Sequence, residues 1–243
     1  MSQTLFRYPG KLYLIPTTLG ESNPIEVLPY AIRKVIEGID NYIVENEKTA
    51  RRSIKLVVPG KNQNTLNLSV LNKFTEAQSL HSFLEPCKEG LDVGLISEAG
   101  CPGIADPGAE MVKLAHEMGI RVIPLVGPSS ILLAMMGSGM NGQSFTFHGY
   151  LPIDKRERKL EIKNLERISS ERNQAQIFIE TPYRNNQLFE DLLQTLHPAT
   201  RLCVACDITL LTEYILTKPV NEWPKTKVDL HKRPTIFIIQ KEN

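Results

Sequence analysis

The chain has 243 residues, 42% of them hydrophobic, which is enough to fill the core of one large or two small domains. Its formal net charge of +1 gives no global field for nucleic acid, so any contact with a polyanion requires a local basic patch. No apolar run reaches the ~18 residues of a membrane helix, residues 1–7 lack the pattern of a signal peptide, and four cysteines do not suggest a disulfide framework. We therefore expect a cytoplasmic protein with reduced thiols and no membrane segment.

Strand and helix signals alternate along the chain, which is typical of an α/β architecture. In chain order, the first half predicts a strand at 11–15, a helix at 28–36, a strand at 42–44, a helix at 48–56, a surface loop at 59–67, a helix at 80–88, a strand at 92–96, a helix at 107–119 and a strand at 122–126. The second half predicts a helix at 131–136, a strand at 145–151, a helix at 154–168, a strand at 175–179, a helix at 186–196, and strands at 201–207, 214–216 and 234–240.

This order predicts two lobes, residues 1–124 and 125–243, with their seam near residues 124–128. Strands separated by helices indicate a mostly parallel sheet in the first lobe. The last strands have little helix between them, which favours a mixed sheet in the second.

Three helices carry local signals. Asp106 can cap the helix at 107–119, with Pro107 at its first position, and Gly119 ends it. Asp154 followed by Glu157 resembles a capping box for the next charged helix. The helix at 131–136 is apolar on every face, so we expect it to be buried.

Two Gly/Pro-dense loops follow the predicted strands at 92–96 and 122–126: residues 97–108, SEAGCPGIADPG, and residues 127–130, GPSS. Ligands of open α/β sheets bind outside the carboxyl ends of the strands, so these loops are predicted to be two walls of one pocket. The loop at 97–108 contains no lysine or arginine. Contact through its main chain suits an uncharged nucleoside or a diffuse cation better than a phosphate.

Several other motifs are better explained by structural roles than by a functional site. The G-x-G-x-x-G string at 137–142 follows a helix rather than a strand, so it is read as a turn. Cys203 and Cys206 are read as buried structural residues, and the five histidines have no metal-ligand spacing, so no metal site is predicted. Residues 155–159 fit either a solvated helix face or a basic patch. Arg184 and the pair at 51–52 follow predicted strands and could line a cleft for a phosphodiester backbone.

Four motifs together resemble the tetrapyrrole methylase superfamily of S-adenosylmethionine-dependent methyltransferases. The likeness is greatest to its bacterial branch that methylates a ribose 2′-oxygen of 16S, small-subunit, ribosomal RNA. Residues 97–108 are similar to that branch's SDAGTPGISDPG, 127–129 to its PGPS turn, 147–152 to its FxGFLP and 180–184 to its ESPHR. The loops at 16–21, 44–48 and 206–210 depart from the branch, and two of these three lie in the first lobe.

The resemblance implies a two-lobed α/β fold with S-adenosylmethionine in the cleft between the lobes, a homodimer, and ribosomal RNA or the small ribosomal subunit as substrate. It implies donor contacts at Leu19, Gly100, Cys101, Pro102, Gly103, Ile104, Ser129, Ser130, Glu180, Ala205, Pro234 and Thr235. Glu45 and Glu98 are candidate bases, and Arg184 and Arg51 would position phosphate. Methylation of a small tetrapyrrole, modification of a protein side chain, and donor binding without activity remain open.

Overall fold

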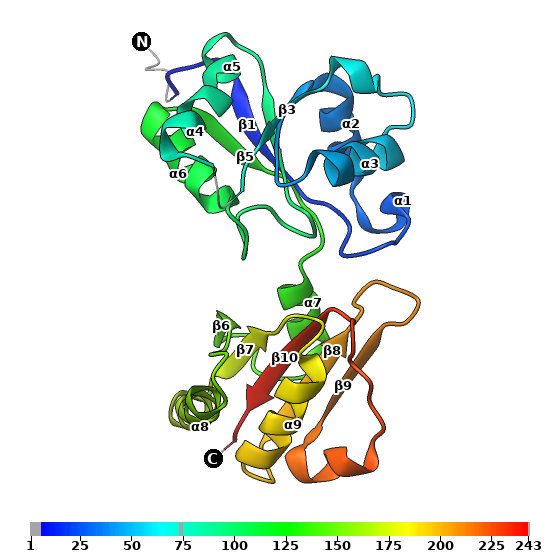
Figure 1. Cartoon of the computed structure of the whole chain (residues 1–243), viewed down its shortest axis with the longest axis vertical. Coiled ribbons are helices and arrows are strands. Elements are labelled where there is room, and N and C mark those ends of the chain that lie inside the picture. The colour runs from blue at the N-terminus through cyan, green and yellow to red at the C-terminus, as the bar shows by residue number, and fades with distance from the viewer. Residues whose placement is uncertain (1–5, 73–74, 243) are drawn as a thin grey trace. The chain divides into compact units, whose positions relative to one another are not determined.

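The computed structural model describes residues 6–72 and 75–242, which form two compact α/β units that divide after Ser129 (Figure 1). The sequence analysis put this boundary after Pro124. Each unit has its own five-stranded sheet and its own core. Residues 1–5, most of the segment considered as a signal peptide, lie outside the described residues.

The sheet of the first unit, sheet A, is entirely parallel. Its strand order is β3 (Asn67–Val70), β2 (Asn41–Val44), β4 (Val93–Ile96), β1 (Lys11–Ile15) and β5 (Arg121–Pro124). The prediction for 59–67 was wrong at its end, because Asn67 already begins edge strand β3. Polar Asn67 and Ser69 interrupt the apolar pattern there, which a half-exposed edge strand tolerates.

Helices cover both faces of sheet A, so its inner strands β2 and β4 are the most deeply buried. One face holds a core cluster with α4 (Ala77–Phe83), α5 (Glu85–Lys88) and α6 (Gly108–Met118). The other face packs on α2 (Tyr30–Gly38) and α3 (Glu47–Val57). Two short elements, α1 (Pro24–Val27) and the 3₁₀ turn η1 (Gln63–Thr65), complete the unit.

Two of these helices differ from the predictions. The helix predicted at 80–88 is two pieces joined at Leu84, because Pro86 interrupts the backbone ladder. Helix α6 starts at Gly108, so Pro107 is its N-cap rather than its first residue. Gly119 ends α6 in the left-handed conformation, φ 74°, as the sequence indicated.

The sheet of the second unit, sheet B, is mixed, as predicted. Its order is β6 (Phe145–Tyr150), β7 (Ala175–Ile179), β10 (Thr235–Gln240), β8 (Arg201–Cys206) and β9 (Tyr214–Pro219). Only β6 and β7 are parallel among these neighbours. The last strand in the sequence, β10, therefore lies in the middle of the sheet.

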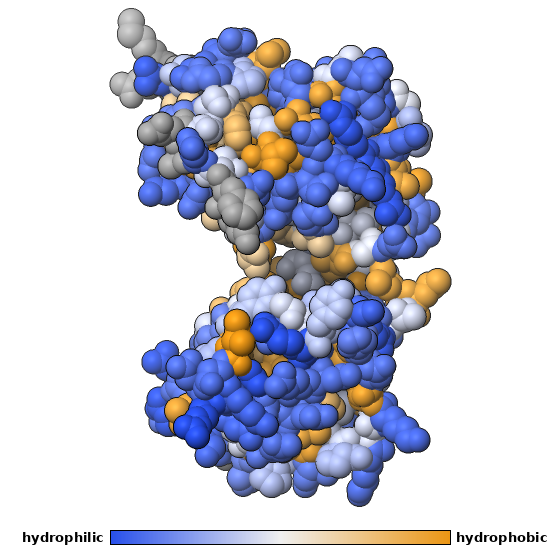
Figure 2. Space-filling view, viewed as in Figure 1, coloured by the Kyte–Doolittle hydropathy of each residue, from blue (hydrophilic) through white to orange (hydrophobic). Residues whose placement is uncertain are grey.

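One face of sheet B packs on α8 (Lys155–Arg172), α9 (Asn185–Thr195) and the 3₁₀ segment η2 (Val220–Lys225). Trp223 of η2 is fully buried and meets the ring of Phe189 edge-on at 5.3 Å. Asp154 Oδ1 caps α8 by accepting from the amides of Arg156 and Glu157 at 2.9 and 3.0 Å. The outer surface of α8 and α9 is mostly hydrophilic (Figure 2).

Helix α7 (Ser130–Ser138) contacts β8, β9 and β10. Its predicted burial was wrong in part. Ala134 and Met135 are buried, whereas 53% of Leu132 and 78% of Met136 are exposed. A helix lying on a sheet buries one side only, so an all-apolar helix leaves its other side uncovered by its own unit.

Candidate functional site at the carboxyl edge of sheet A

The five strands of sheet A end at one edge. Ile15 of β1 lies beside Ile96 of β4, which lies beside Val44 of β2. Leu14 of β1 lies beside Pro124 of β5. The loops after these strands therefore start side by side, at the edge where open α/β sheets bind their ligands.

The loop at 97–108 is held in shape by one carboxylate. Asp106 Oδ1 accepts from the amides of Gly103 and Gly108 at 2.7 and 2.8 Å, so one carboxylate both closes the loop and satisfies the first amide of α6. Gly100 and Gly103 have φ of 74° and 81°, which disfavours other residues there. Asp106 fixes Gly103, and the Gly100 carbonyl accepts from the Thr17 amide at 3.0 Å and from Ser97 Oγ at 2.9 Å, so the loop is preorganised before any ligand arrives.

The bends at Gly100 and Gly127 contact each other, as the sequence predicted. Cys101 Sγ donates to the Pro128 carbonyl at 3.4 Å. A Cβ at Gly100 would lie 3.0 Å from Leu19 Cδ2 and 3.3 Å from the Pro128 carbonyl oxygen. The loops after β1, β4 and β5 thus converge, and Gly100 leaves the space that a side chain would fill.

Glu45 and Glu98 follow neighbouring strands β2 and β4, and the structure brings them together. The Glu98 amide donates to Glu45 Oε1 at 3.3 Å, and Thr49 Oγ1 donates to Glu98 Oε1. Burial raises the pKa of Glu45, the carboxylates of Asp106 and Glu98 add to this, and the Glu98 amide opposes it. Glu45, Pro102 and Asp106 also line an open hollow of about 180 Å³. A partly buried carboxyl with a raised pKa is a suitable proton acceptor.

The site residues predicted in the second unit lie at one end of sheet B. The Glu180 carboxylate is buried and accepts from Arg184 Nη2 at 2.7 Å and from the Thr181 amide at 2.6 Å. Ala205 is fully buried in β8, and Thr235, at the start of β10, is 6% exposed. Pro234 precedes Thr235, and its carbonyl accepts from the Asp207 amide at 2.9 Å. Ala205 therefore offers a ligand no exposed surface, which contradicts its predicted donor contact, and Thr235 offers little.

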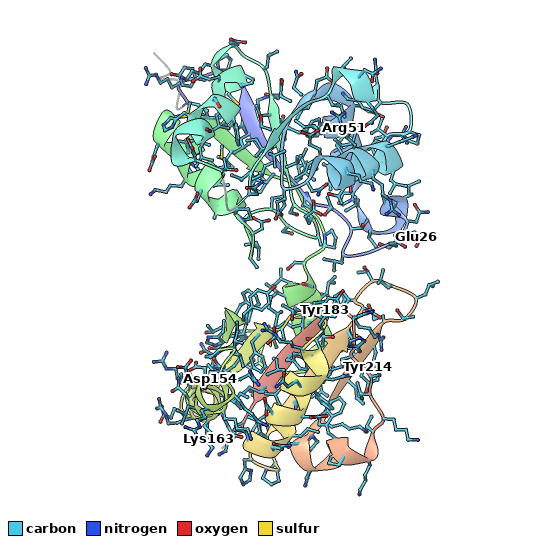
Figure 3. All side chains as sticks on the ribbon, viewed as in Figure 1. Glu26, Arg51, Asp154, Lys163, Tyr183 and Tyr214 are labelled. Carbon is cyan, nitrogen blue, oxygen red and sulfur yellow. The ribbon has the colours of Figure 1, made fainter. Side chains whose placement is uncertain are left out.

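Other predicted residues have structural partners. Arg51 on α3 (Figure 3) donates Nη1 to the Gln63 carbonyl at 2.6 Å, so part of its guanidinium holds a loop of its own unit. Within the basic segment 155–159, Arg158 is buried and donates to Asp191 Oδ2 from Nε at 3.0 Å and from Nη2 at 2.6 Å. The solvated-face interpretation of that segment is wrong for Arg158.

Cys203 and Cys206 are buried, as predicted, and burial raises the pKa of both thiols, that of Cys203 to about 11. Among residues 6–72 and 75–242, no three or more His, Cys, Asp or Glu side chains are arranged to hold a metal ion. Within the same part of the chain, every helix is too short or too polar to cross a membrane.

Three residues important to this geometry were not predicted as site residues. Asp106 was considered only as a helix cap, although it also holds Gly103. Thr49, which binds Glu98, lies in a helix with no motif. Tyr183 stands inside the ETPYR string and is 70% exposed; its position beside Arg184 was the available signal.

Solved structures share this architecture. The methyltransferase CobJ matches with a TM-score of 0.63 and 16% identity, over 96% of this chain and 94% of that one. Uroporphyrin-III-C-methyltransferase from Thermus thermophilus matches with a TM-score of 0.56 at 16% identity, over the same shares. A second structure of the latter enzyme, in complex with S-adenyl homocysteine, has a TM-score of 0.55 at 15% identity and covers 96% and 98%. No protein-family model matches the chain.

The solved structures show that the chain has the fold of these methyltransferases, and its curated sequence relatives also carry methyltransferase names. The names of its sequence relatives describe a narrower activity than the fold does. The chain is 29% identical to Ribosomal RNA small subunit methyltransferase I of Escherichia coli O157:H7 over 234 residues, 95% of this chain and 78% of the relative. It is also 29% identical to the protein of the same name from Bacillus subtilis strain 168 over 213 residues, 88% and 68% of the two chains.

Proposed function

We propose that the chain transfers a methyl group from S-adenosylmethionine to a ribose 2′-hydroxyl of small-subunit ribosomal RNA. The observation that carries this is the convergence of the loops at Gly100 and Gly127 on the carboxyl edge of sheet A. The names of the sequence relatives support the choice of ribosomal RNA as acceptor. Sulfonium chemistry at this edge requires no metal ion from the protein.

The residues present fit the donor. Gly100 leaves a cradle that a Cβ would fill, bounded by Leu19 and the Pro128 carbonyl. The loop at 97–108 offers main-chain groups and no cationic side chain, which suits a positively charged sulfonium nucleoside. By the resemblance, residues 100–104, Leu19 and Ser129 contact the donor from the first unit. Ser130, Glu180, Pro234 and Thr235 are the proposed contacts from the second.

When bound, S-adenosylmethionine would supply a methyl carbon on a positively charged sulfur; the ribose 2′-oxygen would form a bond to that carbon while the carbon–sulfur electron pair passes to the sulfur, which leaves as a neutral thioether. The protein has to align the acceptor oxygen and remove its proton. Glu45 is the proposed proton acceptor, because its carboxylate is partly buried and held toward β4 by the Glu98 amide. Glu98 and Thr49 position this group. Arg184 is proposed to contact a phosphate near the reacting ribose.

We also propose that the enzyme acts as a homodimer in the cytoplasm. The second unit exposes apolar side chains that a second copy could cover, among them Met136, Ile153 and Leu160, which are 78%, 72% and 69% exposed. Light scattering of the purified protein would measure the oligomeric state.

The test is transfer of tritium-labelled methyl groups from the donor to small ribosomal subunits, protein-free RNA, a porphyrinogen and a protein extract in parallel. A 2′-O-methyl group blocks alkaline cleavage of the neighbouring phosphodiester, so label in an alkali-resistant dinucleotide would identify the product. Label in the porphyrinogen or in protein would show that the acceptor is a tetrapyrrole or a protein side chain and would refute ribosomal RNA as the acceptor. Donor binding by calorimetry with no label in any acceptor would indicate a binding protein. Glu45→Gln should lower kcat about 10²- to 10⁴-fold if Glu45 accepts the proton.

A further inference from the structure

The loops at one end of sheet B form a single surface. Ile179, the last residue of β7, pairs with Ile236, and Cys206, the last residue of β8, pairs with Thr235. The loop after β7 at 180–184 therefore lies beside the loop before β10 at 229–234. Figure 3 shows Tyr183 at this end of the unit, where β10 begins.

Hydrogen bonds hold the two loops against each other. The Lys232 amide donates to the Pro182 carbonyl at 2.9 Å, and Asn185 Nδ2 donates to the Arg233 carbonyl at 2.7 Å. Asn186 Oδ1 accepts from the Leu230 amide at 2.8 Å. Every one of these contacts joins residues far apart in sequence, so side chains on both loops keep fixed relative positions.

Tyr183, His231 and Lys232, here called the Tyr183 platform, are exposed on this surface. The Tyr183 side chain is 70% exposed and meets the His231 ring edge-on, with centroids 6.0 Å apart and planes at 78°. Lys232 Nζ lies 5.8 Å from the centroid of the Tyr183 ring. An aromatic ring fixed beside a cation while its own surface stays open to solvent is suited to a planar, electron-rich partner.

Near the platform, the carboxylates of Glu180 and Asp207 are buried, so positive charge dominates the exposed surface. The carboxylates of Glu180 and Asp207 are 2% and 8% exposed, and each already binds an arginine, Arg184 and Arg233 respectively. Among the residues that the structure describes, Lys232 has no ion-pair partner within 4.0 Å, and Arg184 Nε has no hydrogen-bond partner although it is buried. The exposed acid nearby, Asp229, already accepts from Asn186 Nδ2 at 2.9 Å and from the His231 amide at 3.0 Å.

We propose that the Tyr183 platform stacks an unpaired nucleobase of the RNA substrate, with Lys232 contacting the adjoining phosphate. This inference rests on the proposed function and adds the single-stranded character of the substrate. Proteins that bind unpaired RNA combine exposed aromatic faces with flanking cations, whereas paired bases offer no face to stack on. None of the three platform side chains is among the proposed donor contacts, so RNA binding and donor binding can be measured separately.

The test compares Tyr183→Ala, Tyr183→Phe and Lys232→Ala with the unchanged protein for binding of a fluorescent single-stranded RNA. Tyr183→Ala should raise Kd about 5- to 150-fold, and Tyr183→Phe should retain most of the affinity because the ring remains. Lys232→Ala should reduce the slope of log K against log salt by about 0.7. Calorimetry should show an unchanged Kd for S-adenosylmethionine in all three.

Tyr30→Ala is the matched control. Tyr30 is 64% exposed, and Lys34 Nζ lies 5.3 Å from its ring centroid, so the chemistry is the same in the other unit. An equal loss of RNA affinity in Tyr30→Ala would overturn the proposal, as would tight binding of Tyr183→Ala or a weakened donor affinity. Loss of affinity in Tyr183→Ala without any methylation of RNA by the unchanged protein would instead retain the platform and refute the proposed function.

Discussion

Replacing Gly127 by alanine tests the loop contact on which the proposed donor site depends. A Cβ at Gly127 would lie 2.2 Å from Pro16 Cβ and 2.5 Å from Pro16 Cγ, where ordinary contacts begin near 3.4 Å. Pro16 belongs to the loop after β1, and its ring cannot rotate away, so the two loops have to separate by more than an ångström. Overpacking of this kind costs about 1–3 kcal/mol, which corresponds to a fall in Tm of about 2–12 °C.

The separation also moves the carbonyl of Pro128 away from Cys101, so the Kd for S-adenosylmethionine should rise at least about tenfold. Differential scanning calorimetry and titration calorimetry measure the two effects. Gly60→Ala is the control, because a Cβ there meets nothing within 4 Å and should change stability by less than about 0.5 kcal/mol. A Gly127→Ala protein with lowered Tm and normal donor affinity would show that the donor binds elsewhere.

Three further substitutions test individual contacts. Burial raises the pKa of Glu45, so the folded state holds the carboxyl proton more tightly than the unfolded state does. The free energy of unfolding therefore falls as pH rises through the folded pKa. Glu45→Gln should raise Tm at about pH 8, and the gain should vanish near about pH 4 in calorimetry. Arg158→Met leaves the buried Asp191 carboxylate with only the distant ammonium groups of Lys155 and Lys159, at 3.9 and 4.0 Å. It should cost about 3–5 kcal/mol in urea unfolding, with a smaller loss when Asp191→Leu is added, and equal losses would refute the buried pair. Asp106→Ala frees the amide of Gly103 and should cost about 0.5–2 kcal/mol and weaken donor binding, whereas unchanged donor affinity would contradict a preorganised loop.

Local signals predicted most of the elements and the adjacency of the two Gly/Pro loops. Strands buried on both faces are continuous apolar runs, and the two Gly/Pro loops are adjacent because parallel strands end at one edge of a sheet. The helix ends at Asp154 and Gly119 were readable because caps depend on residues next to them in the chain.

Features made by distant residues were not readable. Arg158 lies in a charge-dense stretch, and its partner Asp191 is 33 residues further on, so nothing local indicated burial. The same holds for the Tyr183 platform, because His231 and Lys232 are separated from Tyr183 in the sequence by α9, β8, β9 and η2. The exposure of Met136 depends on which side of α7 meets sheet B, and an all-apolar helix does not reveal that side.

The central place of β10 has a consequence for how the protein is made. Sheet A is complete once residue 124 has been synthesised, whereas β7 and β8 wait for residues 235–240 before their facing edges are hydrogen-bonded. On the ribosome the first unit can fold while the second still exposes two open strand edges, which are prone to mispairing with other chains. Nascent-chain release at different lengths should therefore show the second unit acquiring protease resistance only after residue 240 has been synthesised.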